Sequence, residues 1–598
     1  MLKIFTGKIV EPHRPNVLDI ETAPNGDVIG VGFAYEYQGE IIYKSYEDFE
    51  LFIEEYINFL YTLDEKELKR YSRLYAHNGA NFDYLSLYKY LLENDLLEEA
   101  KYIMADSAGI GAQFTIRGCA ITLFDSYRLL PASLSALSKT FNVENKKLEH
   151  EYNDFLLFKK EQPELFWSYL RNDVLGLQEI IYLFWQRIYE VFGNIGELPM
   201  TLPALALRVF SKQMPGNLLI PTKPELKELE RTAYKGGLTL CLRTGIFENV
   251  NIYDVNSMYP AQMAQQIFPI SYKGYWTTKY KKESIGIWYA SFVQTARNMP
   301  PFLFDNEKGA AYEGKGAFTT QELNYLLEVG GKFEIEKGYV YTDVGTPFKT
   351  FITQCYTMRK EAQKNGDDAL AFTLKIFMNS LYGKFAQREE GNSVVLASPE
   401  AHKELIKNKI PFTPLGDFMA IPEHRNVRHL FVGLAAYVTA YARIDLHKRM
   451  REMILAGYDV LYCDTDSIHV VEGTMLESNE LGAVKREFSG RAAYAGKKIY
   501  ALQDADKHEK TRAKGIGRKL IKNTTPHTRN KKPIRRGAAL TFEEVARLAT
   551  NKSELTAFTF ETFPSVKEVM RGTRKAAVIG PKTRVLRNTG GIWDNDEV

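Results

Sequence analysis

Apolar and polar residues follow two spacings along the chain, one typical of strands and one typical of helices. Strands are predicted where apolar, β-prone residues run between turn signals, at 16–22, 250–253, 394–397, 418–421, 460–462 and 468–471. Helices are predicted where apolar residues recur at helical spacing, at 47–63, 84–92, 166–173, 348–363, 369–385 and 541–548. Clustered Gly and Pro residues between 193 and 221 predict a domain boundary and a partly extended connection. We therefore expect a mixed α/β chain of several domains.

The composition allows a large core and limits the kinds of partner. Of the 598 residues 45% are hydrophobic, and the formal net charge is only +3, so any nucleic-acid surface must be local. The four cysteines show no zinc-type spacing, which indicates a reducing compartment and no zinc site of that kind. No run approaches the ~18 apolar residues that a membrane span needs. We expect a soluble, cytoplasmic monomer without a membrane partner.

Two acids lie at the tip of the predicted hairpin 460–471. Asp464 and Asp466 are separated by one threonine, so their carboxylates repel each other unless a divalent cation neutralises them. Oxygen-rich sites of this kind suit Mg²⁺. Asp254 adds a third acid at the end of a buried strand, which Pro260 is expected to stop. The three acids predict a site for nucleotidyl transfer, where one ion activates a primer 3′-OH and another neutralises the triphosphate.

Acids also gather in the N-terminal part of the chain. Asp19 and Glu21 are two residues apart on one strand and project to the same face. Asp83 stands at the start of a predicted helix, and Tyr169 and Asp173, four residues apart, share a helix face. Two metal ions held by such carboxylates activate water for phosphodiester hydrolysis. Tyr169 is placed to orient that water.

In this order the N-terminal elements resemble the Exo I, Exo II and Exo III motifs of the DEDD 3′–5′ exonucleases attached to family-B DNA polymerases. The resemblance implies that single-stranded DNA is held by four residues: Asn78, Phe82, Ser126 and Tyr127. Tyr127 departs from the family element, which has leucine there. The resemblance also implies a catalytic lysine before the third motif, and either Lys147 or its neighbour Lys146 fits that position.

The second half of the chain resembles the polymerase domain of the same family. Tyr234, Gly236 and Gly237 match its Tyr-x-Gly-Gly element, which resembles a DNA-binding switch between the two activities. The stretch 375–383 reproduces its Lys-x₃-Asn-Ser-x-Tyr-Gly motif, and 498–500 its Lys-x-Tyr element. The implied nucleotide-binding residues are Tyr259, Arg359, Lys375, Asn379 and Tyr382, with Lys364 an alternative to Arg359. Lys498 and Tyr500 are the implied supports of the primer terminus, and Tyr259 packs where a ribose 2′-OH would lie.

Two surplus stretches, 261–347 and 388–428, belong to none of these motifs. They resemble the terminal-protein regions of the protein-primed members of the family. Those members replicate linear genomes of phages, plasmids and adenoviruses. The implied fold is an N-terminal ribonuclease-H-like DEDD exonuclease followed by a right-hand polymerase with palm, fingers and thumb. The expected segments are the exonuclease at 1–190, linker and first palm segment at 191–260, first insertion at 261–347, fingers at 348–387, second insertion at 388–428, palm at 429–505, and thumb and tail at 506–598.

The resemblance implies primer–template DNA, single-stranded DNA and dNTPs as partners, and a terminal protein as a further one. Each active site is expected to take two ions, Mg²⁺ or Mn²⁺. Processivity and strand displacement are implied for the second insertion, and contact with the priming protein for the first. A basic run from Lys507 to Arg536 is expected to contact duplex phosphates.

Two alternatives stay open. A family-B polymerase that needs no protein primer would carry the same residues. A 3′–5′ nuclease with a non-catalytic C-terminal half would be expected to lose Asp254, Asp464 and Asp466, because their mutual repulsion costs stability without a metal.

Overall fold

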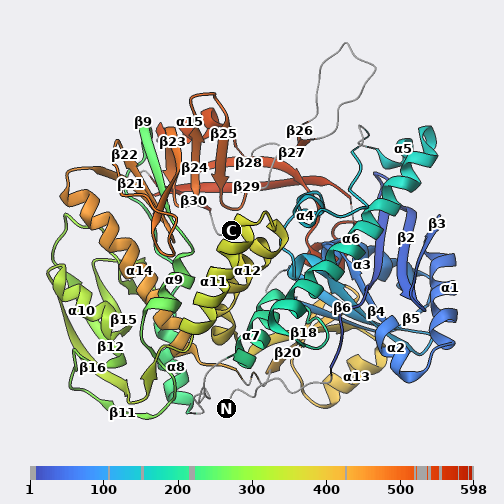
Figure 1. The fold of residues 1–598 in the computed structure, drawn as a ribbon, viewed down its shortest axis with the longest axis horizontal. Helices are drawn as coiled ribbons and strands as arrows, with labels where there is room; N and C mark the ends of the chain where they lie inside the picture. Colours follow the sequence, from blue (N-terminus) through green and yellow to red (C-terminus); the bar gives the residue numbers. More distant parts are fainter. Residues whose placement is uncertain are drawn as a thin grey trace.

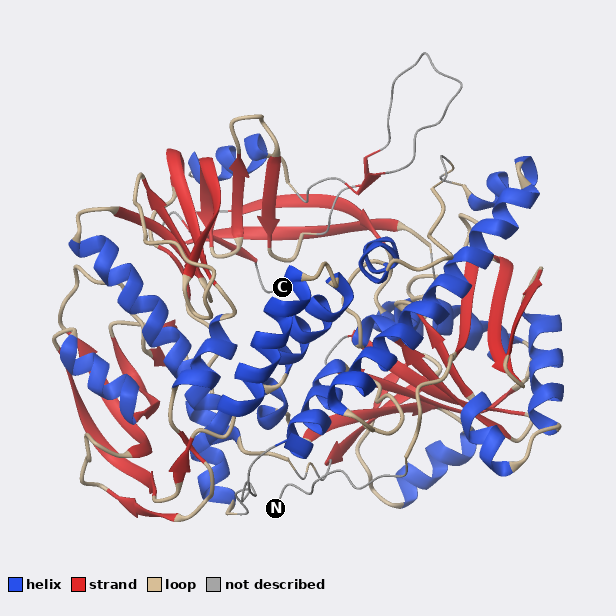
Figure 2. Ribbon diagram, in the orientation of Figure 1, coloured by secondary structure: helices blue, strands red, loops and turns tan. Residues whose placement is uncertain are grey.

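A computed structural model describes the chain from residue 9 to residue 595, apart from 106–107, 150–151, 153, 214–222, 425–426, 428, 517–519, 522–534, 537–539, 551–554, 577 and 590–591. An N-terminal α/β unit, a central sheet and a smaller sheet surround a pair of helices (Figure 1). Helices and strands are both abundant in these parts, which confirms the mixed α/β class (Figure 2). No helix in the described ranges is long and apolar enough to cross a bilayer.

The N-terminal unit is built on a sheet in which β1 (Asn16–Thr22) is an inner strand. Strand β1 pairs antiparallel with β2 (Val28–Tyr37) and parallel with β4 (Arg73–Ala76). The other strands are β3 (Glu40–Tyr46), β5 (Leu97–Ala105), β6 (Ala108–Ile116) and β7 (Cys119–Asp125). The helices are α1 (Phe49–Tyr61), α2 (Glu65–Tyr71), α3 (Asp83–Glu93), α4 (Leu134–Phe141), α5 (Phe155–Glu161) and α6 (Pro163–Phe192). The acids of β1 therefore stand on a strand that is held on both sides.

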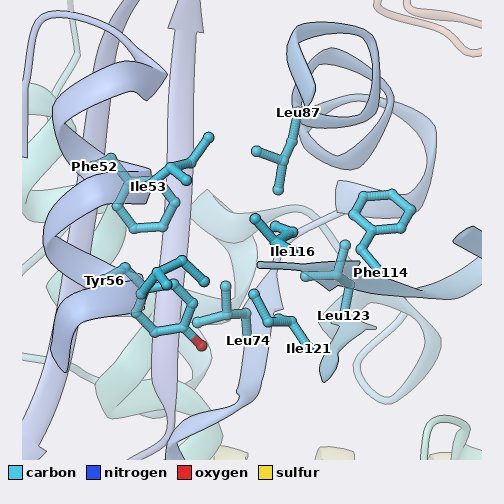
Figure 3. A pocket seen from close by; sticks show the side chains of 10 residues that line it. Phe52, Ile53, Tyr56, Leu74, Leu87, Phe114, Ile116, Ile121 and Leu123 are labelled. Carbon is cyan, nitrogen blue, oxygen red and sulfur yellow. The ribbon is translucent and has the colours of Figure 1, made fainter. Parts of the chain in front are cut away.

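Apolar side chains from α1 and the sheet form part of this unit's core. Helix α1 begins where Asp48 accepts a hydrogen bond from the Glu50 N–H. Its buried face includes Phe52, Ile53 and Tyr56, which border a small apolar cavity (Figure 3). The cavity lining is apolar apart from one tyrosine hydroxyl, so it belongs to the core rather than to a binding site.

Helix α6 packs closely over the other side of the strands. A Cβ on Gly32 of β2 would lie 2.8 Å from Val174 Cγ2 and 3.0 Å from Leu170 Cγ. Glycine is therefore required where α6 crosses the strand. This close approach brings the side chains of α6 to the face of β1 that carries the acids.

The connection to the central sheet starts with an irregular segment at 193–201 and includes two helices that the sequence did not predict. Helix α7 (Leu202–Gln213) occupies much of it, and α8 (Pro224–Ala233) follows. Pro203 lies in the first turn of α7, where the missing proline N–H costs no hydrogen bond. Pro215 and Pro221 lie outside the described residues.

The central sheet has the strand order β25-β24-β23-β9-β22-β21-β8. Its strands are β8 (Thr239–Cys241), β9 (Gly245–Val255), β21 (Asp459–Asp464), β22 (Ser467–Val471), β23 (Val484–Gly496), β24 (Ile499–Gln503) and β25 (Glu509–Ala513). Helices α9 (Met258–Gln265) and α14 (Val432–Leu455) pack against each other beside it. Strand β9 ends at Val255, and Pro260 lies in the first turn of α9, so the expectation that Pro260 stops the strand was wrong.

The pair of helices at the centre of Figure 1 is α11 (Lys349–Lys364) and α12 (Asp368–Ser380). The sequence predicted one continuous helix to residue 385, but α12 ends at Ser380 and a 3₁₀ turn, η3 (Tyr382–Ala386), follows. A distant backbone bond fixes this turn, because the Phe431 N–H donates to the Phe385 carbonyl at 3.0 Å. Tyr382 therefore leaves the helix that carries Lys375 and Asn379.

The two surplus stretches take different positions. Residues 261–347 contain the end of α9 and a sheet in the order β11-β16-β12-β15, with helix α10 between two of its strands. Its elements are β11 (Gly274–Thr277), β12 (Ile285–Gln294), β15 (Glu313–Thr319), α10 (Thr320–Glu328) and β16 (Gly331–Tyr341). Residues 388–428 contain the predicted hairpin strands, now β18 (Glu390–Leu396) and β20 (Phe418–His424), with α13 (Pro399–Lys407) and β19 (Thr413–Leu415) between them. Because β18 pairs with β5, this hairpin extends the N-terminal sheet.

The C-terminal strands run from the central sheet toward the N-terminal unit (Figure 1). They are β28 (Leu555–Thr562), β29 (Gly580–Thr589) and β30 (Ile592–Asn595), and α15 (Phe542–Thr550) precedes them as predicted. The short helix α16 (Val566–Met570) buries its apolar residues in the core that contains β5 and β18 residues. A Cβ on Gly416 would meet the Met570 carbonyl oxygen, so the C-terminal hairpin is seated directly on the second surplus stretch.

Candidate active sites

The acids of the N-terminal unit lie together. Asp19 and Glu21 of β1 and Asp173 of α6 each place a carboxylate oxygen within 4.8 Å of the others. Asp83 stands at the start of α3, and its Oδ1 accepts a hydrogen bond from the Ile20 N–H at 3.2 Å. The four predicted acids thus lie close together on the sheet.

The surroundings of these acids disfavour their charged forms. Burial, and then the neighbouring carboxylates, raise the pKa of Asp19 and of Glu21 well above the usual range. Burial raises the pKa of Asp83 to about 7, although backbone hydrogen bonds oppose this. Several oxygen ligands that repel one another in a buried site are the donor set that a divalent cation neutralises. The residues present therefore fit Mg²⁺ or Mn²⁺.

Lys147 rather than Lys146 points into this cluster. Lys147 Nζ donates a hydrogen bond to the Tyr169 hydroxyl at 2.7 Å and forms an ion pair with Asp173. The Lys146 side chain is exposed, and its carbonyl accepts a hydrogen bond from Asn172 Nδ2 at 3.0 Å. The structure thus places Lys147, and not Lys146, beside the acids, whereas the sequence allowed either lysine.

The residues expected to hold single-stranded DNA differ in their exposure to solvent. Asn78 has a φ of +64°, and its Oδ1 accepts a hydrogen bond from Asn81 Nδ2 at 2.7 Å. Phe82 is half-buried, and its ring centroid lies 4.6 Å from that of Phe563 in the C-terminal hairpin. Ser126 is fully buried, with its hydroxyl donating to the Ala76 carbonyl at 3.1 Å, whereas Tyr127 is 38% exposed. Ser126 therefore holds the segment in place while Tyr127 faces solvent.

The central sheet brings its three predicted acids to one hollow. Asp254 lies one residue before the end of β9, Asp464 is the last residue of β21, and Asp466 is in the following turn. Ser467 of β22 pairs with Asp254 on one side and with Asp464 on the other. All three acids line the same hollow. A strand from the middle of the chain and a hairpin that follows much later in the sequence therefore meet at this hollow.

The charges of this hollow are also unfavourable without a counterion. Burial raises the pKa of Asp254 to about 7, and Asp466 adds to the rise while Lys375 opposes it. Burial and the neighbouring Asp464 raise the pKa of Asp466 to about 6. This donor set too fits a divalent cation.

Two tyrosine rings pack against each other beside the hollow, on the side of α12. The ring centroids of Tyr259 and Tyr382 lie 4.5 Å apart. Lys375 and Asn379 are exposed on α12, and Arg359 is half-buried on the facing helix α11. The Lys364 side chain is exposed at the end of α11. The predicted nucleotide-binding residues thus come from α11, α12, the 3₁₀ turn η3 and the start of α9.

Basic and aromatic residues line the other wall of the hollow. Lys498 Nζ lies 3.4 Å from Asp464 Oδ2, and Tyr500, Lys510 and Arg512 line the same hollow. Of the predicted basic run, Arg518, Lys519, Lys522, Arg529, Lys531 and Lys532 lie outside the described residues.

Three residues of this site were missed by the sequence reasoning. Glu487 lines the hollow, Thr239 donates a hydrogen bond to Asp464, and Arg443 donates to the carbonyls of Lys235 and Gly236 at 2.8 and 2.9 Å. Arg443 is buried and pairs with Glu322 of α10 at 2.6 Å, which ties the Tyr234–Gly237 loop to the first surplus stretch. No local pattern marks these residues, because strand register and helix packing alone bring them to the site.

Comparison with known proteins agrees with this arrangement. Residues 64–165 and 159–414 match the family described as DNA polymerase type B, organellar and viral. The DNA-directed DNA polymerase of Enterobacteria phage PRD1 is 28% identical over 528 residues, covering 84% of this chain and 85% of that protein. The DNA polymerase of Bacillus phage Nf is 25% identical over 420 residues, covering 64% and 67%. A probable DNA polymerase of Ascobolus immersus is 25% identical, and the match spans 83% of this chain but only 46% of that longer protein.

Solved structures share the fold. Phi29 DNA polymerase in complex with primer–template DNA and incoming nucleotide aligns with a TM-score of 0.69 at 18% identity, over 96% of this chain and 99% of that one. The same polymerase with primer–template DNA alone aligns with a TM-score of 0.64 at 19% identity, over 84% and 92%. This chain therefore shares the overall fold of that polymerase. The match to the family covers more than half of the residues, so this chain belongs to the type B DNA polymerases of organellar and viral origin.

Proposed function

We propose that this type B polymerase extends a primer at the hollow of the central sheet and removes 3′-terminal nucleotides at the N-terminal acid cluster. The observation that carries the proposal is the convergence of Asp254 with Asp464 and Asp466 on one hollow. The separate cluster of Asp19, Glu21 and Asp173 supports the second activity. One chain then carries a synthetic site and a proofreading site.

In the synthetic site the acids hold the cations, and the surrounding residues hold the substrates. Two Mg²⁺ or Mn²⁺ ions bound there would lower the pKa of the primer 3′-OH and neutralise the triphosphate. Lys375, with Arg359 opposite, binds the triphosphate of the incoming dNTP, and Asn379 positions the nucleotide. Lys498 and Tyr500, beside Asp464, support the primer terminus.

Tyr259 sets the sugar preference in this proposal. Its ring packs against that of Tyr382 at a tilted angle of 35°, and a Cβ on Gly237 would lie 3.0 Å from its hydroxyl. The ring is therefore held from two sides beside the acids and leaves no room for a 2′-OH.

In the proofreading site Lys147 and Tyr169 act next to the acids. Lys147 neutralises part of the charge on Asp173 and holds the Tyr169 hydroxyl by a hydrogen bond. Tyr169, fixed in this way, orients the attacking water. Asn78, Phe82 and Tyr127 guide the single-stranded 3′ end toward Asp19 and Glu21.

We further infer that synthesis starts on a protein hydroxyl. The match to organellar and viral polymerases and the two surplus stretches at 261–347 and 388–428 support this inference. The first stretch then contacts the priming protein. The second, seated between the N-terminal sheet and α16, closes around the template and gives processive, strand-displacing synthesis. Initiation assays with and without a separate terminal protein distinguish this from ordinary primer extension.

One experiment tests the two active sites together. A labelled primer–template is incubated with Mg²⁺ or with EDTA, with and without dNTPs. Asp466→Asn is expected to abolish extension and keep degradation, whereas Asp19→Ala with Glu21→Ala is expected to do the converse. Extension that survives in Asp466→Asn, or degradation that survives in the double variant, contradicts the assignment of that site.

A further inference from the structure

A threonine that follows the Tyr234–Gly237 loop is bonded directly to one of the central acids. Thr239 is the first residue of β8, and the register of β8 against β21 places it opposite Asp464. Its Oγ1 donates a hydrogen bond to Asp464 Oδ1 at 2.8 Å, across 225 positions of sequence. The contact therefore exists only because the two strands pair in this register.

The same carboxylate oxygen has a second hydroxyl donor. Thr465 Oγ1 donates to Asp464 Oδ1 at 3.1 Å, while Oδ2 lies on the side of Lys498 Nζ, 3.4 Å away. A carboxylate with two donors on one oxygen is restricted in its rotation, so it presents the other oxygen in a defined direction. Thr239 contributes one of the two restraints from outside the hairpin.

The loop before Thr239 is packed against the same hairpin turn. Thr465 has a φ of +64°, which β-branched residues rarely adopt, and its N–H donates to the Leu238 carbonyl at 2.8 Å. A Cβ on Gly237 would lie 2.7 Å from Thr465 Oγ1, so only glycine allows this approach. The loop, Thr239 and the acidic turn therefore form one packed unit.

We propose that Thr239 is a positioning residue for Asp464, and that the Tyr234–Gly237 loop influences cation binding in the central hollow through it. The inference rests on the two-cation chemistry proposed above for this site. Hydrogen bonds that orient a metal ligand commonly change metal affinity or activity about 10- to 100-fold. The N-terminal acids are oriented by β1, α3 and α6, so their cation binding is independent of Thr239.

The test measures cation binding directly in the full-length chain. The N-terminal acids are first removed by Asp19→Ala with Glu21→Ala. Mn²⁺ binding to the complex with a dideoxy-terminated primer–template is then followed by the EPR signal of free Mn²⁺. Binding that is lost on Asp466→Asn is assigned to the central hollow.

Four variants are compared in this background. Thr239→Val keeps the shape of the side chain without its hydroxyl, Thr239→Ala is a second deletion of the hydroxyl, and Thr239→Ser restores it. Thr511→Val is the matched control, because Thr511 lies in the same sheet and its buried hydroxyl has no hydrogen-bond partner among the described residues.

We expect Thr239→Val and Thr239→Ala to weaken Mn²⁺ binding in the hollow about tenfold, and Thr239→Ser and Thr511→Val to retain it. In the chain with intact N-terminal acids, the Mg²⁺ concentration for half-maximal extension rises by the same factor, while that for degradation is unchanged. An unchanged isotherm in the two deletion variants, or an equal loss in Thr511→Val, overturns the positioning role. Mn²⁺ binding and extension that both survive Asp466→Asn instead overturn the proposed function.

Discussion

Glu230 is a buried carboxylate where α8, β16 and the start of α14 meet. Its Oε1 accepts a hydrogen bond from the Tyr341 hydroxyl at 2.7 Å, and the Gly433 N–H also donates to the carboxylate. Its Oε2 is buried without a hydrogen-bond partner among the residues that the structure describes. Burial raises the pKa of Glu230 from 4.5 to about 7, against the opposing effect of these hydrogen bonds. Between pH 4.5 and about 7, folding therefore favours the protonated acid.

This raised pKa makes the stability of the junction depend on pH. The contribution of Glu230 to the stability of the folded junction between α8, β16 and α14 is fully present below the unfolded pKa of 4.5. It is lost as the pH rises through about 7. At about 1.4 kcal/mol for each pH unit, the difference between 4.5 and about 7 corresponds to a loss of about 3 kcal/mol at alkaline pH. Glu230→Gln keeps the acceptor oxygen and does not ionise, so we expect this loss to disappear in the variant.

Hydrogen exchange followed by mass spectrometry measures the effect locally, which is needed because a chain of several domains need not unfold in one step. Peptides from α8 and α14 are compared at about pH 5 and about pH 9, after correction for the intrinsic exchange rate. The local unfolding free energy should fall by about 3 kcal/mol between these pH values in the parent chain and stay level in Glu230→Gln. Glu228→Gln, exposed on the same helix, is the control and should behave as the parent. A Glu230→Gln variant with the same pH dependence as the parent would refute the reasoning.

Two further predictions concern the active sites. Tyr259→Val should admit ribonucleotides about 10- to 100-fold more readily, because the ring that excludes the 2′-OH is removed. Single-nucleotide insertion measures the ratio of ribonucleotide to deoxynucleotide incorporation. An unchanged ratio means that the ring is only structural. Lys147→Ala should lower degradation about 10- to 100-fold and leave extension intact, because it removes the hydrogen bond to the Tyr169 hydroxyl and the cation that pairs with Asp173. Lys146→Ala is the matched control for degradation of a labelled single strand, and an equal loss in both lysine variants would contradict the assignment.

The sequence by itself determined the elements that carry the chemistry. Asp19 and Glu21 share a face because strand side chains alternate, and Tyr169 and Asp173 share one because they are four apart on a helix. Asp464 and Asp466 lie at a hairpin tip because β-prone residues flank a short polar turn. Each of these features depends on residues within one or two turns of structure, so local patterns were sufficient.

Only the tertiary structure decided how these elements meet. The pairing of Thr239 with Asp464, and the addition of β18 to the sheet at β5, depend on strand register between distant segments. Alternation of side chains leaves that register undefined, so no local pattern carries it. The end of α12 at Ser380 and the burial of Ser126 were missed for a related reason. In both cases a backbone or side-chain group is satisfied by a partner far along the chain, and such partners exist only after the separate elements have packed.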